Sequence, residues 1–167
     1  MIAESARLVI REFEVDDSAS LMNVFGDEEV MRYGDGVKTL EWVEYTIREW
    51  RKDYCERGYG KWAVVTQDGS QLLGYCGLEN LDMDGKQEVA IGYRLARPYW
   101  GQGYASEAVI AVRDFGLNAL GLKRLVATID PSNTASIRVV QKAGFVYEKD
   151  VMFEGYSHPD YVYTFER

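Results

Sequence analysis

Hydrophobic and polar positions alternate with two different periods along the chain, and the two periods predict strands and helices in a definite order. Residues 8–13 alternate in the manner of an opening strand. Asp16 or Asp17 can cap a helix that runs toward Phe25, because a short carboxylate side chain accepts from the first free backbone N–H groups. The chain therefore begins with a strand and a short helix.

The next segment has a clear helical period. Thr39 is a natural N-cap, and the pattern ends near Gly58 and Gly60. The apolar side chains recurring at helical spacing are Leu40, Val43, Ile47, Trp50 and Tyr54. An amphipathic helix is expected here.

Three strand-like runs follow, over residues 61–67, 72–80 and 87–95. The dipeptides Asp68-Gly69 and Asp84-Gly85 separate them, and both are typical of tight hairpin turns. These runs predict an antiparallel meander.

The second half of the chain changes to alternating helices and strands. A glycine-rich loop opens a helix with an apolar face that contains Ala105, Val109 and Val112. The remaining predicted elements are a strand over 125–129, a helix over 133–143 that stops at Gly144, and strands over 145–150 and 161–165. We expect one α+β domain spanning residues 1–167, with a single mixed, mostly antiparallel sheet of six to seven strands flanked by about four helices.

Composition narrows the classes of function. A chain of 167 residues without internal repeats fits one domain. Its net charge of −8, from 27 acidic and 19 basic residues, disfavours a nucleic-acid partner and favours cationic molecules such as amines. Cys55 and Cys76 lie far apart and His158 is the only histidine, so no metal site is expected. No window approaches the roughly 18 apolar residues of a membrane span, and we expect a cytoplasmic protein without membrane contact.

The loop from Pro98 to Ala105 links a predicted strand to a predicted helix. Glycines there let the backbone approach an anion, and a helix start offers unpaired N–H groups. A dinucleotide site would need a third glycine where Ser106 stands, and a phosphate-binding P-loop would need Gly-Lys-Ser/Thr, which is missing. A tight turn without a ligand stays open on these residues alone.

Three motifs in order carry a resemblance to a known family. They are Ile91-Gly92-Tyr93, the stretch Tyr99-Trp100-Gly101-Gln102-Gly103-Tyr104-Ala105, and Asn133-x-x-Ser136 followed by Lys142-Ala143-Gly144-Phe145. Together they resemble the GCN5-related N-acetyltransferases, and within these the ribosomal-protein-alanine and spermidine acetyltransferase branch. The resemblance covers nearly the whole chain, from Arg7 onward.

The resemblance implies acetyl-CoA as the cofactor, with coenzyme A as product, and no metal. Backbone groups at Tyr93, Arg94 and Leu95 would hold the thioester, and Asn133 the pantetheine arm. The residues expected around the pyrophosphate are Gly101, Gln102, Gly103, Tyr104, Ala105 and Ser106.

The sequence departs from the family pattern at Pro98, where relatives usually carry Gln or Arg, and Arg97 is the alternative contact. Arg138 and Lys142 are candidates for the coenzyme's phosphates, with solvated surface as the alternative reading.

Transfer to an amine requires removal of a proton from the amine and a proton donor for the leaving thiolate. By resemblance, Ser136 or a water that it holds protonates the sulfur, whereas plain helix capping is the alternative for Asn133 and Ser136. Glu79 and Glu88 are candidate bases. Relatives carry a glutamate where this chain has Ala90, so the family assignment does not transfer, and a reaction without a dedicated base stays open.

Met31, Arg32, Tyr33 and Glu79 are the candidates for contact with the acceptor, since their region walls the acceptor site in relatives. The predicted function is transfer of an acetyl group from acetyl-CoA to a primary amine, on a protein N-terminus or a small molecule, by direct attack on the thioester. The alternative is a catalytically silent coenzyme A-binding sensor or scaffold. A homodimer is possible, since dimers are common in the branch.

Overall fold

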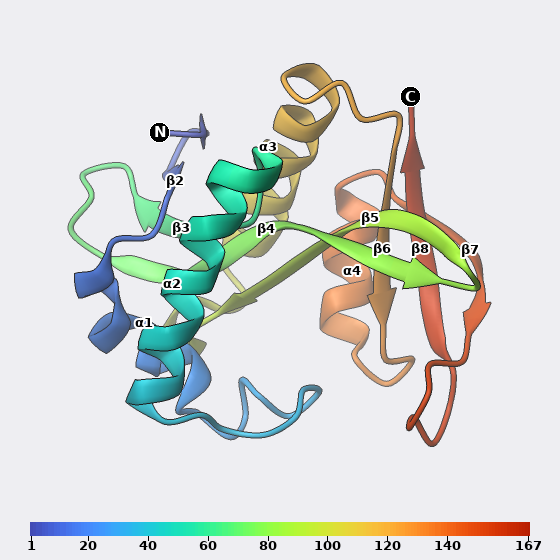
Figure 1. The fold of residues 1–167 in the computed structure, drawn as a ribbon, viewed down its shortest axis with the longest axis horizontal. Helices are drawn as coiled ribbons and strands as arrows, with labels where there is room; N and C mark the ends of the chain where they lie inside the picture. The colour runs from blue at the N-terminus through green and yellow to red at the C-terminus, as the bar shows by residue number, and fades with distance from the viewer.

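The computed structural model describes all residues, 1–167, and contains one eight-stranded sheet with four α-helices (Figure 1). The strands are β1 Ala3–Glu4, β2 Leu8–Arg11, β3 Lys61–Thr66, β4 Leu72–Met83, β5 Lys86–Leu95, β6 Arg124–Ile129, β7 Val146–Val151 and β8 Asp160–Glu166. The helices are α1 Ser18–Phe25, α2 Leu40–Arg57, α3 Tyr104–Asn118 and α4 Thr134–Lys142.

The sheet is mixed, with the strand order β1-β2-β3-β4-β5-β6-β8-β7. Every neighbouring pair is antiparallel except β5 and β6, which are parallel and joined by α3. The expected α+β class is confirmed. The sheet has one more strand than expected, because β1 pairs through only two residues, too few for an alternating pattern in the sequence.

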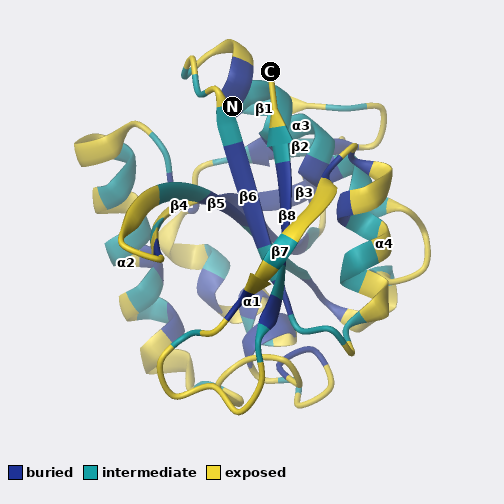
Figure 2. Cartoon of the chain, turned by 90° about the vertical axis from the view of Figure 1, so that its right-hand side faces the viewer, coloured by how far each residue is buried: buried dark blue, intermediate teal, exposed yellow.

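The two faces of the sheet are covered by different helices, and each helix pair has its own core (Figures 1 and 2). On one face α1 and α2 pack through Leu21 and Ile47 onto Ala63 and Tyr75. On the other face α3 and α4 join a second core, which contains Val109, Val140, Leu78 and Ile91. Strand β7 forms an edge of the sheet and is mostly exposed (Figure 2).

Local signals set the ends of α2 as expected, but neither aspartate caps α1: Asp17 precedes the helix without a side-chain cap, because its carboxylate accepts from the N–H of Glu14 at 2.8 Å instead. The Oγ1 atom of Thr39 accepts a hydrogen bond of 3.2 Å from the N–H of Trp42, and Gly58 ends α2 with a φ of 77°. After α4, Gly144 has a φ of 84°, which lies in the region that favours glycine. No helix combines the length and the apolar character needed to cross a membrane.

The β4–β5 hairpin extends further than its sequence pattern predicted. The added residues are Leu81 to Met83 in β4 and Lys86 in β5, which stay paired up to a turn in which Asp84 and Gly85 both have positive φ. The extension is short, and its apolar side chains Leu81 and Met83, of which Met83 is buried, give too few alternating positions to mark a strand in the sequence.

Candidate active site

A slot opens between the two central parallel strands. Strand β5 pairs with β6 at a single register position, Ala90 with Val126, and then leaves it. Residues 91–95 remain paired with β4 on their other side. Their backbone therefore presents one free edge toward the slot, where an extended ligand can form strand-like hydrogen bonds.

The glycine loop follows β5 at the end of this slot. The indole N–H of Trp100 donates to the carbonyl of Leu95 at 2.7 Å and ties the loop to the strand. Gly101 and Gly103 have φ values of 72° and 83°, which only glycine adopts readily. The N–H groups of residues 101–103 donate to no protein atom, and those of 104–106 form the first turn of α3. The loop is thus a set of free donors at a helix start, and it fits a pyrophosphate.

Arg7 supports this loop from the start of the chain. Its guanidinium donates to the carbonyl of Gln102 at 3.0 Å and to Glu107 at 2.8 Å, and it lies 4.2 Å from the ring centre of Tyr104. The sequence placed Arg7 only at the beginning of the family resemblance. Its contact with a loop about a hundred residues away exists only in the folded chain.

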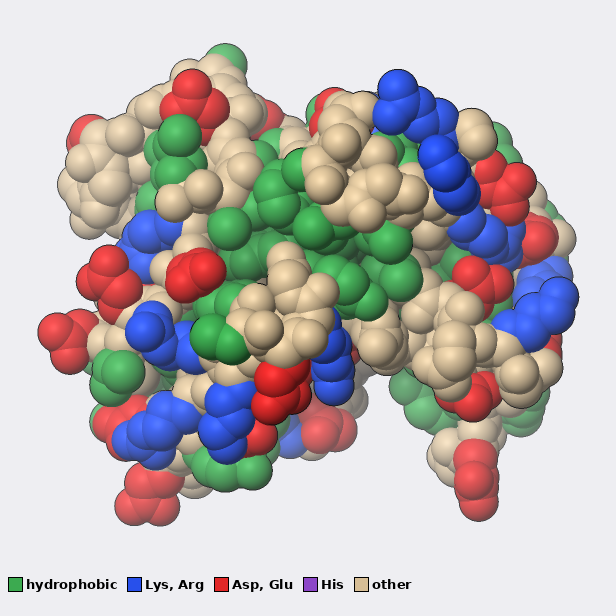
Figure 3. Space-filling view, turned by 45° about the horizontal axis from the view of Figure 1, so that its top comes forward, with side chains coloured by type: hydrophobic (Ala, Val, Ile, Leu, Met, Phe, Trp, Pro, Cys, Tyr) green, Lys and Arg blue, Asp and Glu red, His purple; other side chains and the backbone are tan.

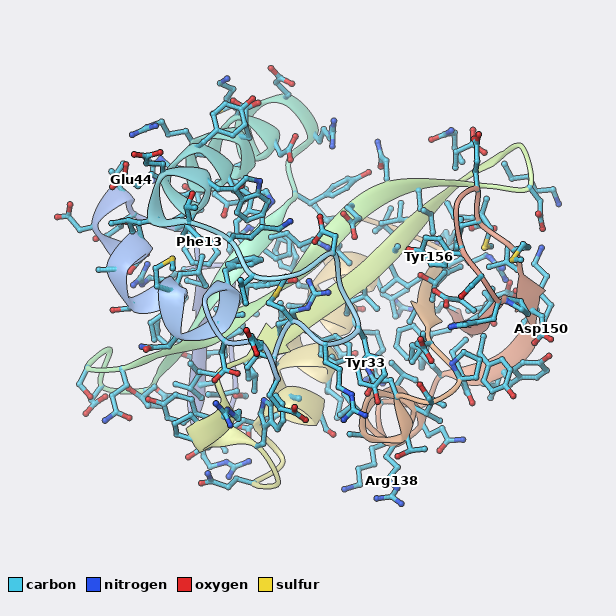
Figure 4. All side chains as sticks on the ribbon, turned by 90° about the horizontal axis from the view of Figure 1, so that it is seen from below. Phe13, Tyr33, Glu44, Arg138, Asp150 and Tyr156 are labelled. Carbon is cyan, nitrogen blue, oxygen red and sulfur yellow. The ribbon has the colours of Figure 1, made fainter.

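The three basic candidates for phosphate binding differ in their surroundings. The Nε atom of Arg97 lies 2.7 Å from Asp27 in an ion pair. Arg138 and Lys142 are exposed on α4 and form no ion pair, and Figure 4 shows Arg138 projecting outward. The positive charge of α4 is therefore available to a ligand, whereas that of Arg97 is neutralised.

The start of α4 meets β5 through a pair of hydroxyl groups. The Tyr93 hydroxyl lies 2.7 Å from the Oγ atom of Ser136 and 3.1 Å from its carbonyl oxygen. Burial raises the pKa of Tyr93 well above its usual value, although the bond to Ser136 opposes this shift, so the phenol stays protonated. The Asn133 side-chain oxygen caps α4 by accepting from the N–H of Ser136 at 3.2 Å, which leaves the amide NH₂ free to donate.

On the opposite face of the sheet, Glu79 stands directly across from Ala90 in the β4–β5 register. Its Oε1 atom lies 2.6 Å from the Nζ atom of Lys61, whose side chain is only 9% exposed. A Cβ atom on Gly92 would lie 2.6 Å from this ammonium group, so the glycine makes the room that the ion pair occupies. Lys61 was not singled out in the sequence, because it begins an otherwise apolar strand.

Glu88 lies apart from this group. It binds Arg124, which also contacts Glu148 and Glu166, and these charges connect β5, β6, β7 and β8. The geometry gives Glu88 a sheet-stabilising ion pair and brings only Glu79 to the open part of β5.

The loop between α1 and α2 runs beneath the sheet toward α4 (Figures 1 and 4). Of the three candidates in it, Met31 is buried in the core and Arg32 points to solvent beside Glu29. The Tyr33 hydroxyl donates to the carbonyl of Ser132 at 3.3 Å, just before α4. Tyr33 thus bridges the loop to the far side of the slot.

The surface itself is mixed in charge. On the face drawn in Figure 3, acidic and basic side chains are interspersed, and hydrophobic side chains gather in the hollow between two bulkier parts. No group of three or more His, Cys, Asp or Glu side chains is arranged to hold a metal ion.

Comparison with known proteins agrees with this geometry. Residues 7–146 match the family described as acetyltransferase (GNAT) domain. Protein YkkB of Bacillus subtilis (strain 168) is 38% identical over 152 residues, which cover 87% of this chain and 85% of YkkB. The N-acetyltransferase YoaA of the same organism is 31% identical, over 88% of this chain and 84% of YoaA. A GNAT-family acetyltransferase structure from Bacillus anthracis superposes with a TM-score of 0.84 at 28% identity, covering 98% of this chain and 97% of that one.

The match spans most of the chain, and it includes the loop, the slot and the start of α4 that the structure brings together. The chain therefore belongs to the GNAT family and is an acetyl-CoA-dependent acetyltransferase.

Proposed function

We propose that the protein transfers the acetyl group of acetyl-CoA to a primary amine by direct attack on the thioester. The observation that carries the proposal is the slot: β5 leaves β6 after one register pair, with the free donors of residues 101–106 at one end and Ser136 beside it. RimL in complex with coenzyme A, a ribosomal L7/L12 alpha-N-protein acetyltransferase, shares this fold with a TM-score of 0.79 at 19% identity.

In this proposal the chain's own groups hold the cofactor and divide the proton transfers. The loop amides bind the pyrophosphate, the amide NH₂ of Asn133 binds the pantetheine arm, and the free edge of residues 93–95 stabilises the developing oxyanion. Acetyl-CoA supplies an activated acyl group. As the nitrogen–carbon bond forms and the carbon–sulfur bond breaks, Ser136 donates a proton to the sulfur. Either hydroxyl can donate in the 2.7 Å contact between Tyr93 and Ser136; the proposal uses the direction in which Tyr93 donates, so that the serine's own hydrogen is free to point to the slot.

Glu79 is the base in this proposal. Side chains directly opposite in an antiparallel pair have Cβ atoms about 5 Å apart, so Glu79 brings a carboxylate close to the place where relatives carry one at the position of Ala90. In this proposal Glu79 on β4 takes the role of the glutamate that relatives carry on β5. Its partner Lys61 fixes the carboxylate over Gly92, next to the free stretch of β5.

The test is a thiol-release assay with acetyl-CoA and a panel of amines and N-terminal peptides. Release that depends on the amine supports an enzyme. Tight binding of acetyl-CoA without release to any acceptor would instead favour the silent sensor. Membership of the ribosomal-protein-alanine and spermidine branch, the homodimer and the cytoplasmic location stay predictions.

A further inference from the structure

Arg94 differs from every other half-buried arginine of the chain. Four arginines are neither buried nor exposed: Arg11, Arg94, Arg113 and Arg124. The other three bind carboxylates, with N–O distances down to 2.5 Å. Arg94 has no carboxylate partner, and its one hydrogen bond goes to the hydroxyl of Tyr75 at 2.9 Å. A half-buried guanidinium has lost part of the water that stabilises its charge. A bound anion would replace that stabilisation, whereas one hydrogen bond to a neutral hydroxyl does not.

The position of Arg94 connects it to the acceptor. Arg94 and Gly92 lie two residues apart on β5, about 7 Å along the strand, so the Arg94 side chain faces the side of the sheet on which Gly92 leaves room for Lys61. This is the side of Glu79 and Lys61, opposite to the side on which Tyr93 contacts α4. If an amine reaches the slot from the Glu79 side, a second group that it carries a few bonds from its nitrogen therefore lies near Arg94.

The groups around Arg94 leave donors without acceptors. The nearby charges are already matched, since Lys61 binds Glu79 at 2.6 Å and Lys38 binds Asp35 at 2.7 Å. The Tyr75 hydroxyl accepts from Arg94 and has no acceptor for its own hydrogen. The guanidinium N–H groups and the phenol O–H are all hydrogen-bond donors without acceptors. They suit a carboxylate, which accepts hydrogen bonds and donates none.

The α1–α2 loop is shaped to leave room for this guanidinium. A Cβ atom on Gly34 would lie 2.7 Å from the Nη2 atom of Arg94, so any larger residue there would move the charged group. The same loop reaches α4 through Tyr33. The guanidinium thus lies between the sheet and the loop that covers the proposed acceptor side.

We propose that Arg94, with the Tyr75 hydroxyl, binds a carboxylate on the acceptor, so that the enzyme acetylates amino-acid-like amines in preference to simple amines and polyamines. This inference rests on the proposed amine acetylation. The chain's negative charge attracts the ammonium group, and Arg94 selects among amines by the second group that they carry.

The experiment compares amino acids with their decarboxylated counterparts: lysine with cadaverine, ornithine with putrescine, and phenylalanine with phenethylamine. The wild type should prefer the carboxylate-bearing member of at least one pair. Arg94→Met should raise the KM for that amino acid by about ten- to hundredfold more than it changes the KM for the decarboxylated counterpart, which is the size expected for loss of a charge-assisted contact. Arg48→Met, which removes an exposed arginine of α2, is the control. Gly34→Ala retains the charge but displaces it, and it should reduce the same preference if Arg94→Met does not fold.

Three results would overturn the inference: a wild-type preference for the decarboxylated members, an equal loss for both members of a pair, or a rise in the KM for acetyl-CoA alone. If no amine is acetylated, the proposed function fails, and Arg94 is then tested separately by ligand-observed NMR with N-acetyl amino acids and the matching N-acetyl amines. Binding of the acids that Arg94→Met abolishes would support the carboxylate site. Absence of binding, or binding equal to that of the amines, would refute it.

Discussion

A charge placed at Gly101 tests whether the loop holds the pyrophosphate. A Cβ atom on Gly101 would contact nothing within 4 Å, whereas one on Gly103 would lie 3.4 Å from Arg7. An aspartate at position 103 would therefore be partly neutralised by the arginine. Position 101 is the cleaner choice, because its new carboxylate has no protein partner.

Gly101→Asp and Gly101→Asn form a matched pair. Both side chains tolerate the left-handed backbone that the φ of 72° requires, so the two variants share the cost of leaving glycine and differ only in charge. Two unit charges about 6 Å apart interact by about 3 kcal/mol at an effective dielectric constant of about 20, and by about 0.7 kcal/mol in bulk water. The aspartate should therefore weaken binding at least about tenfold more than the asparagine, given two phosphate charges and 1.4 kcal/mol per factor of ten.

Isothermal titration with acetyl-CoA measures this difference directly. Thermal unfolding without ligand is the control, and both variants should unfold close together, since the position lies outside α3. The gap in affinity should narrow with added salt, because the loop is exposed. Equal affinities of the two variants would refute the assignment of the pyrophosphate to this loop.

Four further predictions follow from particular contacts. Ser136→Ala should lower kcat about 10²-fold, and Tyr93→Phe should lower it less, with the double variant no worse than Ser136→Ala; independent losses in thiol release would contradict the hydroxyl pair. Glu79→Gln should reduce kcat/KM for the amine at neutral pH while the KM for acetyl-CoA stays the same, and an undiminished kcat/KM would exclude Glu79 as the base. Hydrogen bonds from Thr66 and Ser70 lower the pKa of Asp68 to about 2, so its contribution to stability, present above the unfolded pKa of about 3.9, should disappear as the pH falls toward 2, and Asp68→Asn should remove that part of the acid dependence in urea titrations. Gly74→Ala should cost at least about 2 kcal/mol in urea unfolding, because its Cβ atom would lie 2.1 Å from the carbonyl oxygen of Arg94; Gly69→Ala, with a positive φ but open space, is the control, and an equal cost would contradict the clash.

Local signals explain how much of the fold could be predicted. Thr39 and Gly58 bound α2, and Asp84-Gly85 turns the β4–β5 hairpin, because capping and positive φ are properties of a few adjacent residues. The two-residue strand β1 gave no such signal, since its pairing with β2 is the only reason that it is a strand.

The site was less predictable, because it is assembled from partners distant in sequence. The loop and α4 were found from their motifs, but the side-chain partners of their residues were not. Lys61 on β3 forms an ion pair with Glu79 on the neighbouring strand β4, and Arg7 donates a hydrogen bond to Gln102, which is far away in the sequence. Tyr93 was assigned a backbone role, whereas its hydroxyl contacts Ser136. Sequence periodicity predicts which face a side chain takes, and only the register determines what it meets.

The position of the one cysteine near the slot bears on the order of the chemistry. Cys76 is the register partner of Tyr93, which would suit a nucleophile that takes the acetyl group before the amine arrives. However, its side chain is fully buried, and burial raises the pKa of the thiol to about 12, so almost none is thiolate at neutral pH. Glu79 and the slot, in contrast, lie open to the acceptor side. This arrangement supports direct transfer, in which Ser136 serves the leaving sulfur from one face of the sheet and Glu79 serves the amine from the other.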